Sequence, residues 1–265
     1  MSKFSSYKTI VFKVGTSTLA HSSGHVNIRS MENLVKVLSD VKNMGYNIVL
    51  VSSGAIGVGV GKLGLKQKPT DTPTKQAVAS VGQCELMYIY DKLFSGYNHK
   101  VAQILLTGDV LDQQQRRSNV MNTFSKLAEL GCIPIVNEND TVAVEEIEFG
   151  DNDALSALVA KLIGADALVI LSDIDGLFTK NPRTHSDAEL IDDVPVIDDY
   201  ICSLAENTCT NLGTGGMITK LRAAQSATES GIDVYIVNGK NPLILYDLFD
   251  GIKCGTHFHG KGKTQ

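Results

Sequence analysis

A strand–helix–strand pattern at the start of the chain constrains the fold most strongly. Residues 8–14 (KTIVFKV) form a short, β-branched and mostly apolar run that is typical of a buried strand. Residues 28–44 carry apolar side chains at helical spacing and end at Gly45, and residues 47–51 (NIVLV) form a second apolar run. Two strands joined by a helix make a βαβ unit, which implies a parallel sheet and a right-handed crossover. We therefore expect an α/β fold.

The same alternation continues along the chain. We expect further strands at residues 99–106, 133–136, 167–171 and 233–237, helices at 76–94 and 217–230, a short hairpin strand at 189–197 and a short helix at 198–205. The polar, proline-containing residues 68–75 indicate a connecting loop. Because open α/β sheets bind ligands at the carboxyl ends of their strands, the turns that follow these strands are candidate binding residues.

Size and composition exclude several classes of protein. The 265 residues suffice for one large α/β domain or two small ones, and a net charge of −5 gives no reason to expect a nucleic-acid surface. Five cysteines are scattered without a C-x-x-C pair, as in reduced intracellular proteins. Lys13 interrupts the first apolar run, and later runs are too short to span a membrane. We expect a cytoplasmic protein without membrane or nucleic-acid partners.

The first two strands each end in a turn that suits a ligand. Lys13 lies inside the first strand, where burial is costly unless the ammonium is paired or reaches a ligand. Gly15 allows backbone N–H groups to approach an anion. A lysine that reaches solvent from an edge strand is the alternative interpretation. Ser53, Gly54 and Ala55 follow the second strand at the same edge of the sheet.

The glycine-rich run at residues 54–64 resembles a nucleotide-binding loop, but its spacing rejects that interpretation. Leu63 stands where a P-loop requires Ser or Thr, and the glycines are spaced G-x-G-x-G rather than as in the Rossmann fingerprint. We interpret the run as a helix start that brings the backbone close to a ligand or to another helix.

A second Gly/Thr-rich turn opens a later helix. Thr214, Gly215 and Gly216 precede the helical run that starts at Met217. Free N–H groups and the positive end of a helix form an anion cradle. Lys220 lies one turn into this helix, so its ammonium can reach back over the cradle. A plain helix N-terminus is the alternative.

A cluster of acids and amides lies between the fourth strand and the next helix. Asp140 follows the strand, and Asp151, Asn152 and Asp153 stand at the start of the helical run that reaches Lys161. Asp or Asn at a helix start caps free N–H groups, so a capped helix after a solvated turn is the alternative to a ligand site. The position at the end of a strand favours the ligand site.

Two further pairs of side chains are assigned to the surface. Arg116 and Arg117 are able to face an anion, but a solvated helix face is the favoured interpretation. His257 and His259 alternate on one strand face without a third ligand nearby in the sequence, so we interpret them as surface residues. No metal site is therefore assigned to the side chains of the chain.

Together these groups suit the transfer of a phosphoryl group to a small amine-bearing acceptor. Phosphoryl transfer requires alignment and positive charge more than covalent help from the protein. Lys13 and Lys220 are placed to supply the charge, and Asp140 and Asp151 to pair with an ammonium group of the acceptor. Asn152 adds neutral hydrogen bonding. The residues alone indicate a nucleotide-using enzyme and no more.

Seven motifs run in one order across nearly the whole chain: KVGTS at 13–17, VSSGAIGVG at 51–59, QILLT at 103–107, PIVNENDTVA at 134–143, FGDNDALSALVA at 149–160, LSDIDGLFTKNPR at 171–183 and GTGGMITKLRAA at 213–224. Each motif is weak alone, whereas the set is specific. The set resembles the amino acid kinase superfamily and, within it, the glutamate 5-kinase family. Related kinases for aspartate, N-acetylglutamate, carbamate or UMP usually lack NEND followed by GDND.

Carried over residue by residue, the resemblance implies a role for each motif. Lys13 and Lys220 would stabilise the transferring phosphoryl group, and Asp153 would orient the two lysines. The implied glutamate-binding residues are Ser53, Gly54, Ala55, Asp140, Asp151 and Asn152. The implied ATP-binding residues are Lys13, Gly15, Ser172, Asp173, Thr214, Gly215, Gly216, Met217 and Lys220. Mg²⁺ is expected with ATP because the phosphates need charge neutralisation.

The resemblance also implies architecture and partners. We expect a three-layer αβα sandwich with a mainly parallel sheet in a single domain, residues 1–265, binding glutamate in about residues 1–163 and ATP in about residues 164–260. The expected reaction converts L-glutamate and ATP to L-glutamyl 5-phosphate, the first step of proline biosynthesis. A homo-oligomer (dimer or tetramer), inhibition by L-proline and hand-over to glutamyl phosphate reductase are implied. The RNA-binding-like PUA domain of many bacterial relatives is not expected.

Three other functions are considered. A non-catalytic nucleotide sensor would be expected to lose the two lysines and the acidic cluster, which are present. A dehydrogenase would be expected to carry the Rossmann fingerprint, which is missing. Another acceptor within the superfamily would keep the ATP site and change only the acceptor residues.

Overall fold

An eight-stranded sheet forms the centre of the computed structural model, which describes residues 3–21, 23–111, 113–142, 152–207 and 216–262. The strand order is β3-β4-β2-β1-β5-β9-β10-β8, and β6 pairs with β7 in a separate small sheet. The strands are β1 (Thr9–Val14), β2 (Asn47–Ser52), β3 (Val101–Leu106), β4 (Ile133–Glu138), β5 (Ala167–Ser172), β6 (Leu177–Phe178), β7 (Leu190–Ile191), β8 (Asp193–Val194), β9 (Asp233–Asn238) and β10 (Thr256–Phe258).

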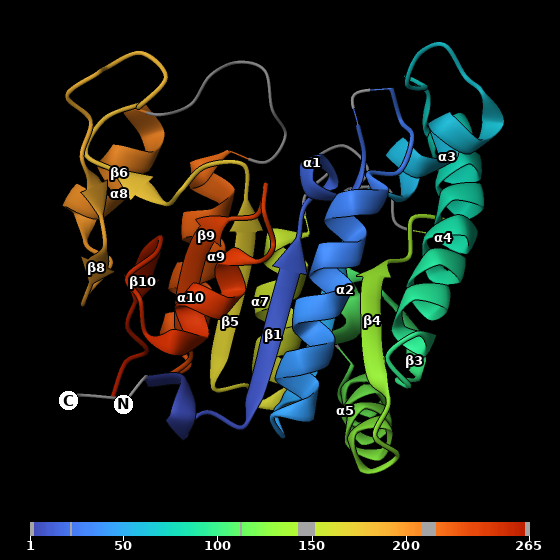
Figure 1. Ribbon diagram of the computed structural model, residues 1–265, viewed down its shortest axis with the longest axis horizontal. Helices are drawn as coiled ribbons and strands as arrows, with labels where there is room; N and C mark the ends of the chain where they lie inside the picture. Colours follow the sequence, from blue (N-terminus) through green and yellow to red (C-terminus); the bar gives the residue numbers. More distant parts are fainter. Residues whose placement is uncertain (1–2, 22, 112, 143–151, 208–215, 263–265) are drawn as a thin grey trace.

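Helices cover both faces of the large sheet (Figure 1). They are η1 (Lys3–Ser6), α1 (Thr16–Leu19), α2 (Ile28–Asn43), α3 (Ala55–Leu63), α4 (Thr72–Ser95), η2 (Gly108–Leu111), α5 (Gln114–Glu129), α7 (Asp153–Ile163), α8 (Asp199–Asn207), α9 (Met217–Thr228) and α10 (Ile244–Asp250). α2, α4 and α10 pack on one face, and α5, α7 and α9 pack on the other. The three-layer αβα sandwich predicted from the sequence is confirmed.

β1 lies in the middle of the sheet and is buried on both faces. It pairs in parallel with β2 and β5, so that Lys13 stands opposite Val51 and Ile170. Phe12 packs in the core that includes α2 and α4, whereas Val11 packs in the core that includes α7 and α9. A strand covered on both faces needs a nearly continuous apolar run, which explains the composition of β1. Lys13 shares the face of Val11 and therefore points toward α7 and α9.

Six neighbouring strands of the large sheet, β3, β4, β2, β1, β5 and β9, all run parallel, which the first βαβ pattern predicts. The far edge differs, because β10 runs antiparallel to β9 and β8 runs parallel to β10. The single strand expected at residues 189–197 is wrong. The chain leaves the small sheet after Ile191 and enters the large sheet at Asp193. Such a change of partner leaves no mark in the periodicity of a short run.

The loop expected at residues 68–75 is also partly wrong, because α4 begins at Thr72. Asp71 is the N-cap residue, and its side chain accepts a hydrogen bond from the Thr74 N–H at 2.9 Å. Pro73 is compatible with the first turn of a helix, where no N–H is needed. The polar letters of this stretch are thus a helix start rather than a loop. In the described parts of the chain no helix is both long and apolar enough to cross a bilayer.

The glycine-rich run forms α3, which packs closely against α4. A Cβ atom on Gly59 would lie 2.0 Å from the Val78 carbonyl oxygen, and one on Gly82 would lie 1.8 Å from the Ala55 carbonyl oxygen. Backbone therefore touches backbone between the two helices. The sequence left open whether these glycines approach a ligand or another helix, and the contact with α4 accounts for Gly59.

Candidate active site

The turns singled out in the sequence lie at one edge of the sheet. Gly15 follows β1, Ser53 follows β2, Asp140 lies two residues after β4, and Ser172 ends β5. The four strands are parallel neighbours, so their carboxyl ends share the edge that binds ligands in open α/β folds. The candidate site is therefore assembled by the topology from segments that are far apart in the sequence.

Two lysines meet one carboxylate at this edge. The Lys13 ammonium lies 2.5 Å from one carboxylate oxygen of Asp153, and the Lys220 ammonium lies 3.0 Å from the other. Lys13 is 3% exposed, Lys220 6% and Asp153 0%. β1 is a central strand, so the alternative of a lysine reaching solvent from an edge strand is wrong. The structure brings together the three residues predicted to be catalytic.

The electrostatics of this group favour an anion. Two ammonium groups and one carboxylate are taken out of water together, which costs solvation that the ion pairs offset only in part. Thr219 adds a hydrogen bond from its hydroxyl to Asp153 at 3.0 Å. Asp153 is therefore contacted by two cations and a hydroxyl donor. A phosphate near the two lysines would restore the charge balance of the group.

Thr219 is a residue of this site that sequence analysis missed. Its hydroxyl oxygen also lies 2.8 Å from the Gly216 carbonyl oxygen, so its single proton is shared between that carbonyl and Asp153, which ties the start of α9 to Asp153. Its position next to Lys220, one turn into the helix, could have identified it in the sequence as a residue of the site.

The start of α9 supplies free backbone donors. Gly216 is the N-cap residue, and its backbone is extended, with φ −71° and ψ −179°. Among the described residues no side chain caps the helix there, so N–H groups of its first turn are available to a ligand, apart from that of Thr219, which donates to the Gly216 carbonyl at 3.2 Å. Met217 is buried at the first helical position. Thr214 and Gly215 lie outside the described residues.

Ser172 ends β5 with a buried hydroxyl. Among the described residues this hydroxyl has no hydrogen-bond partner, while its carbonyl accepts the Gly239 N–H at 2.7 Å. A buried hydroxyl without a partner is costly, so the position suits a ligand group. Asp173, the next residue, is exposed and forms an ion pair with Arg183 at 2.9 Å.

Ser53, Gly54 and Ala55 turn the chain from β2 into α3. Gly54 has φ +95°, a left-handed conformation that favours glycine, and Ala55 is the first helical residue. The Ser53 hydroxyl is buried and has no hydrogen-bond partner in the described part of the chain. Like Ser172, it is a donor placed at the ligand edge without an internal use.

Asn152 precedes α7 but does not cap it with its side chain, which counts against the alternative of a capped helix. Its amide group donates instead to the Ser52 carbonyl and to the Asn137 side-chain oxygen, both at 2.6 Å. Asn137 in turn donates to Gln83 at 2.6 Å. Both amide hydrogens of Asn152 are thus committed, and its carbonyl oxygen remains the group that can contact a ligand.

Asn137 and Gln83 are residues of this network that sequence analysis missed. Asn137 could have been found from its place in NEND, whereas Gln83 sits inside a helical run with no local signal.

The remaining acceptor candidates lie beyond β4. Asp140 is half-buried two residues after the end of the strand. Asp151 lies outside the described residues, as do residues 143–150 before it. Arg116 is exposed and pairs with Asp109 at 2.7 Å, and Arg117 is also exposed, which agrees with a solvated helix face.

Solved structures with a similar fold include a carbamate kinase and a UMP kinase. The structure resembles carbamate kinase from Giardia lamblia bound to AMP-PNP, with a TM-score of 0.67 and 15% identity over 96% of this chain and 99% of that chain. It also resembles UMP kinase from Bacillus anthracis, with a TM-score of 0.63 and 16% identity over 97% of each chain. At these identities the likeness concerns the fold alone.

Sequence comparison defines the family. The model described as the amino acid kinase family matches residues 8–238. The chain is 54% identical to glutamate 5-kinase of Clostridium perfringens, covering 96% of each sequence. It is 53% identical to glutamate 5-kinase of Listeria innocua, covering 96% of this chain and 94% of that relative. The chain therefore belongs to the amino acid kinase family and, within it, to the glutamate 5-kinase family.

Proposed function

We propose that the chain transfers the γ-phosphoryl group of ATP to the γ-carboxylate of L-glutamate, giving L-glutamyl 5-phosphate and ADP. This reaction is the first step of proline biosynthesis from glutamate. The observation that carries the proposal is the meeting of Lys13 and Lys220 on the buried carboxylate of Asp153. The high identity to glutamate 5-kinases supports glutamate as the acceptor.

The reaction needs no general base. The γ-carboxylate of glutamate has an ordinary pKa of about 4.3, so it is already ionised at neutral pH. One of its oxygens forms a bond to the γ-phosphorus, while the bond from that phosphorus to the bridging oxygen breaks. The electron pair of the broken bond leaves with ADP, and no proton moves. The protein must supply alignment and positive charge.

We assign that charge to Lys13 and Lys220. Lys13 extends from β1 beside the turn at Ser53, whereas Lys220 comes from the first turn of α9. Their ammonium groups approach the same carboxylate and are therefore held close together despite their mutual repulsion. We assign to Asp153 the role of a positioning residue, because it holds the lysines rather than the substrate.

ATP is the phosphoryl donor, and Mg²⁺ supplies charge neutralisation on its phosphates. The described side chains fit an ion that is held mainly by phosphate oxygens and water. Both carboxylate oxygens of Asp153 face lysines, and Asp173 is paired with Arg183. Neither carboxylate is therefore free to form a metal cage, so the ion is expected to enter with ATP.

For glutamate we assign a hydrogen bond from the Ser53 hydroxyl and one to the side-chain carbonyl of Asn152. The first rests on the buried hydroxyl without a partner among the described residues, and the second on the two committed amide hydrogens. Gly54 and Ala55 would offer backbone N–H groups to a carboxylate. Asp140 and Asp151 would pair with the α-ammonium group.

For ATP we assign the phosphates to Gly15 and to the turn that contains Thr214, Gly215, Gly216 and Met217, and the remainder of the nucleotide to Ser172 and Asp173. Among the described residues a Cβ atom on Gly15 would have no neighbour closer than 4.0 Å, which supports a close approach of a phosphate to this backbone. This assignment divides a single domain into a glutamate half, about residues 1–163, and an ATP half, about residues 164–260.

One assay tests the reaction and the acceptor together. We would measure ADP release with Mg·ATP and glutamate, aspartate, N-acetylglutamate, carbamate or UMP, and trap acyl phosphates with hydroxylamine. We expect signal with glutamate alone and formation of γ-glutamyl hydroxamate. Turnover of another acceptor would overturn the glutamate assignment, and ATP binding without turnover of any acceptor would favour a nucleotide sensor.

We further propose a homo-oligomer, dimer or tetramer, in the cytoplasm, with inhibition by L-proline and hand-over of the labile acyl phosphate to glutamyl phosphate reductase. These proposals rest on the resemblance to the family. Light scattering at several protein concentrations tests the oligomer, and a single mass equal to the monomer would contradict it. Proline titration of the hydroxamate assay tests the inhibition, which unchanged turnover would refute.

A further inference from the structure

Three potential metal ligands meet at the β8–β10 edge of the sheet, away from the candidate active site. Asp193 begins β8, His257 lies in β10, and His259 follows it. β10 pairs with the start of β9, with His257 opposite Tyr235, so the group lies toward the amino ends of the parallel strands. The active-site turns lie at the carboxyl ends. The sequence placed the two histidines on one strand face and offered no third ligand, but the fold supplies one.

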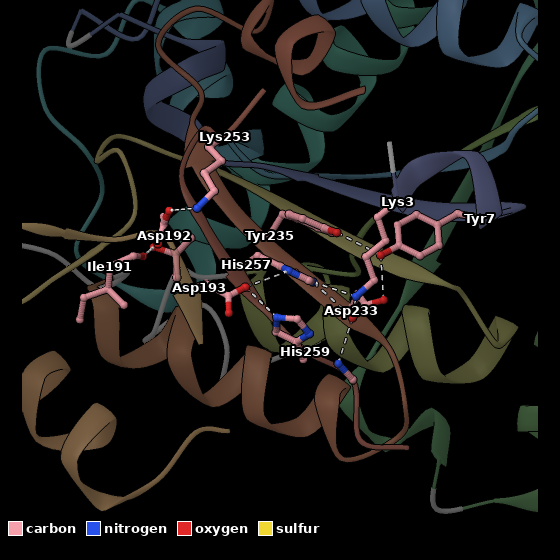
Figure 2. Close-up of polar contacts among 12 residues, drawn as sticks. Lys3, Tyr7, Ile191, Asp192, Asp193, Asp233, Tyr235, Lys253, His257 and His259 are labelled. Atoms are coloured by element: carbon pink, nitrogen blue, oxygen red, sulfur yellow. Dashed lines mark hydrogen bonds and ion pairs between the residues drawn. The ribbon is translucent and has the colours of Figure 1, made fainter. Parts of the chain in front are cut away.

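The three side chains converge on one point (Figure 2). The Asp193 carboxylate oxygen lies 2.7 Å from Nε2 of His259 and 3.6 Å from Nδ1 of His257. One ligand atom from each residue lies within 4.8 Å of the others. Ligand atoms about 2.0–2.2 Å from a tetrahedral metal ion are about 3.3–3.6 Å apart. Small side-chain adjustments therefore suffice to place all three atoms around one ion.

His257 is held by a second layer of contacts. Its Nε2 lies 3.3 Å from the buried carboxylate of Asp233, and its ring stacks on Tyr235 with centroids 4.3 Å apart and planes 5° apart. When Nε2–H donates to Asp233, the lone pair of Nδ1 faces Asp193. Two acceptor atoms then face each other, an arrangement that a cation relieves. A carboxylate behind the distal nitrogen is the usual support of a metal-binding histidine.

Asp233 is itself fixed. It accepts hydrogen bonds from the Tyr7 hydroxyl at 2.7 Å and from the Gly260 N–H at 3.0 Å, and it pairs with Lys3 at 3.1 Å. The carboxylate behind His257 is thus anchored by contacts from three other residues of the chain.

We propose that Asp193, His257 and His259 bind one divalent transition-metal ion, with Zn²⁺ or Co²⁺ as the matching class and water completing the coordination. Two imidazole nitrogens and one carboxylate oxygen suit these ions, whereas Mg²⁺ prefers oxygen ligands alone. The ion would join β8 to β10 and, through His257 and Asp233, to β9. Its role is to stabilise this edge of the sheet rather than to take part in phosphoryl transfer.

The test is a Co²⁺ titration of the full-length chain, made metal-free and without nucleotide. We expect one ion per chain, d–d absorption and no thiolate-to-cobalt charge-transfer band. His259→Gln and Asp193→Asn should each weaken binding at least about tenfold, since each removes a ligand. His185→Gln is the matched control, because His185 is an exposed histidine that contacts Thr184 and not the cluster. It should leave the affinity unchanged.

Three results would overturn the proposal. Equal Co²⁺ affinity in the wild type and both ligand variants would place the ion elsewhere, and a charge-transfer band would place it on cysteine. Absence of binding at millimolar Co²⁺ would mean that hydrogen bonds alone hold the cluster.

Thermal unfolding gives a second readout: Zn²⁺ should raise the Tm of the wild type and the His185→Gln variant but not of His259→Gln. The kinase assay with Mg·ATP should be equal for His259→Gln and the wild type, so the two proposals fail independently.

Discussion

At the scale of single residues, Lys220 offers the clearest test of the proposed mechanism. Lys220→Ala removes one of two ammonium groups that we assign to the moving phosphoryl group. We expect kcat to fall about 10²–10³-fold, the usual loss when one donor to the developing charge is removed. Asp153 retains its ion pair with Lys13, so the fold should persist, as circular dichroism can check. Steady-state kinetics with hydroxylamine trapping measures the loss.

Lys161→Ala is the matched control for that variant. Lys161 lies on α7, two turns from Asp153, and its exposed ammonium contacts only the Ser226 hydroxyl among the described residues. Its removal should leave turnover unchanged. Turnover of the Lys220→Ala protein at the Lys161→Ala level would refute the role of Lys220.

Asp140 tests the acceptor site. Asp140→Ala removes a carboxylate that we assign to the ammonium of glutamate, so KM for glutamate should rise about tenfold or more, with a smaller change in kcat. KM for ATP should stay the same. An unchanged KM for glutamate, measured at saturating Mg·ATP, would exclude Asp140 from the acceptor site.

Residue types could be predicted from the sequence more readily than side-chain directions. Lys13 is conspicuous because a charge inside an apolar strand demands a partner. The role of Asp153 as that partner was implied by the resemblance to the glutamate 5-kinase family. The direction of the Asn152 side chain depends on the Ser52 carbonyl, which lies 100 positions earlier in the chain. No local pattern encodes such a contact, which is why the sequence left a helix cap open as the alternative role of Asn152.

At the scale of elements, the packing of α3 on α4 can be tested with one methyl group. Gly59→Ala would place a Cβ atom 2.0 Å from the Val78 carbonyl, so the helices must separate. We expect the free energy of unfolding to fall by about 1–3 kcal/mol, as in other overpacked interfaces. Urea unfolding followed by circular dichroism measures this change.

Gly57→Ala in the same helix is the matched control. Within the described part of the chain its Cβ atom would meet only the Thr16 side-chain methyl, at 3.3 Å, and the gain in helix propensity offsets that contact. Stability should therefore be nearly unchanged. Equal losses in both variants would mean that glycine flexibility, rather than close packing, explains the run.

Elements were predicted best where burial is complete. β1, β2, β5 and β9 are covered on both faces, so their apolar runs stand out. The errors fall at surface connections, where the N-cap Asp71 turned an expected loop into helix and where β7 and β8 join different sheets. Neither α1 nor α10 was expected, because four and seven residues are too few for a clear helical period.

At the scale of the whole molecule, stability should fall at alkaline pH because burial raises the pKa of several tyrosines, Tyr90 among them. Burial raises the pKa of Tyr90 well above its ordinary value of 10.0, and the hydrogen bond with Ser52 offsets only part of that rise. The unfolded state therefore releases a proton first as the pH rises. The contribution of Tyr90 to the free energy of unfolding is complete below pH 10. Above pH 10 it is lost by about 1.4 kcal/mol per pH unit until the folded-state pKa is reached.

Tyr90→Phe should flatten this alkaline decline. At pH 7 it should cost about 1 kcal/mol for the hydrogen bond to Ser52, whereas near pH 11 the variant and the wild type should approach equal stability. Tyr88→Phe on the same helix is the control, because Tyr88 is 62% exposed. Urea unfolding from pH 8 to pH 11 checks the expectation, which parallel curves for Tyr90→Phe and wild type would contradict.

The order of the strands could not be predicted from the sequence. Local patterns identify strands and their direction. The spatial order β3-β4-β2-β1-β5-β9 depends on the face of the sheet on which each connecting helix packs. That order decides which turns become neighbours, so it also decides the composition of the candidate site.

Lys13 and Lys220 belong to different halves of the chain, yet each pairs with one of the two oxygens of the same carboxylate. The separation of the two charges is therefore set by a chemical constant, the width of a carboxylate group, rather than by the exact spacing of β1 and α9. Long lysine side chains can absorb small displacements of their backbones and still find the same two oxygens. Substitutions in the core around β1 and α9 that shift these elements by about an ångström should therefore leave the distance between the two ammonium groups unchanged.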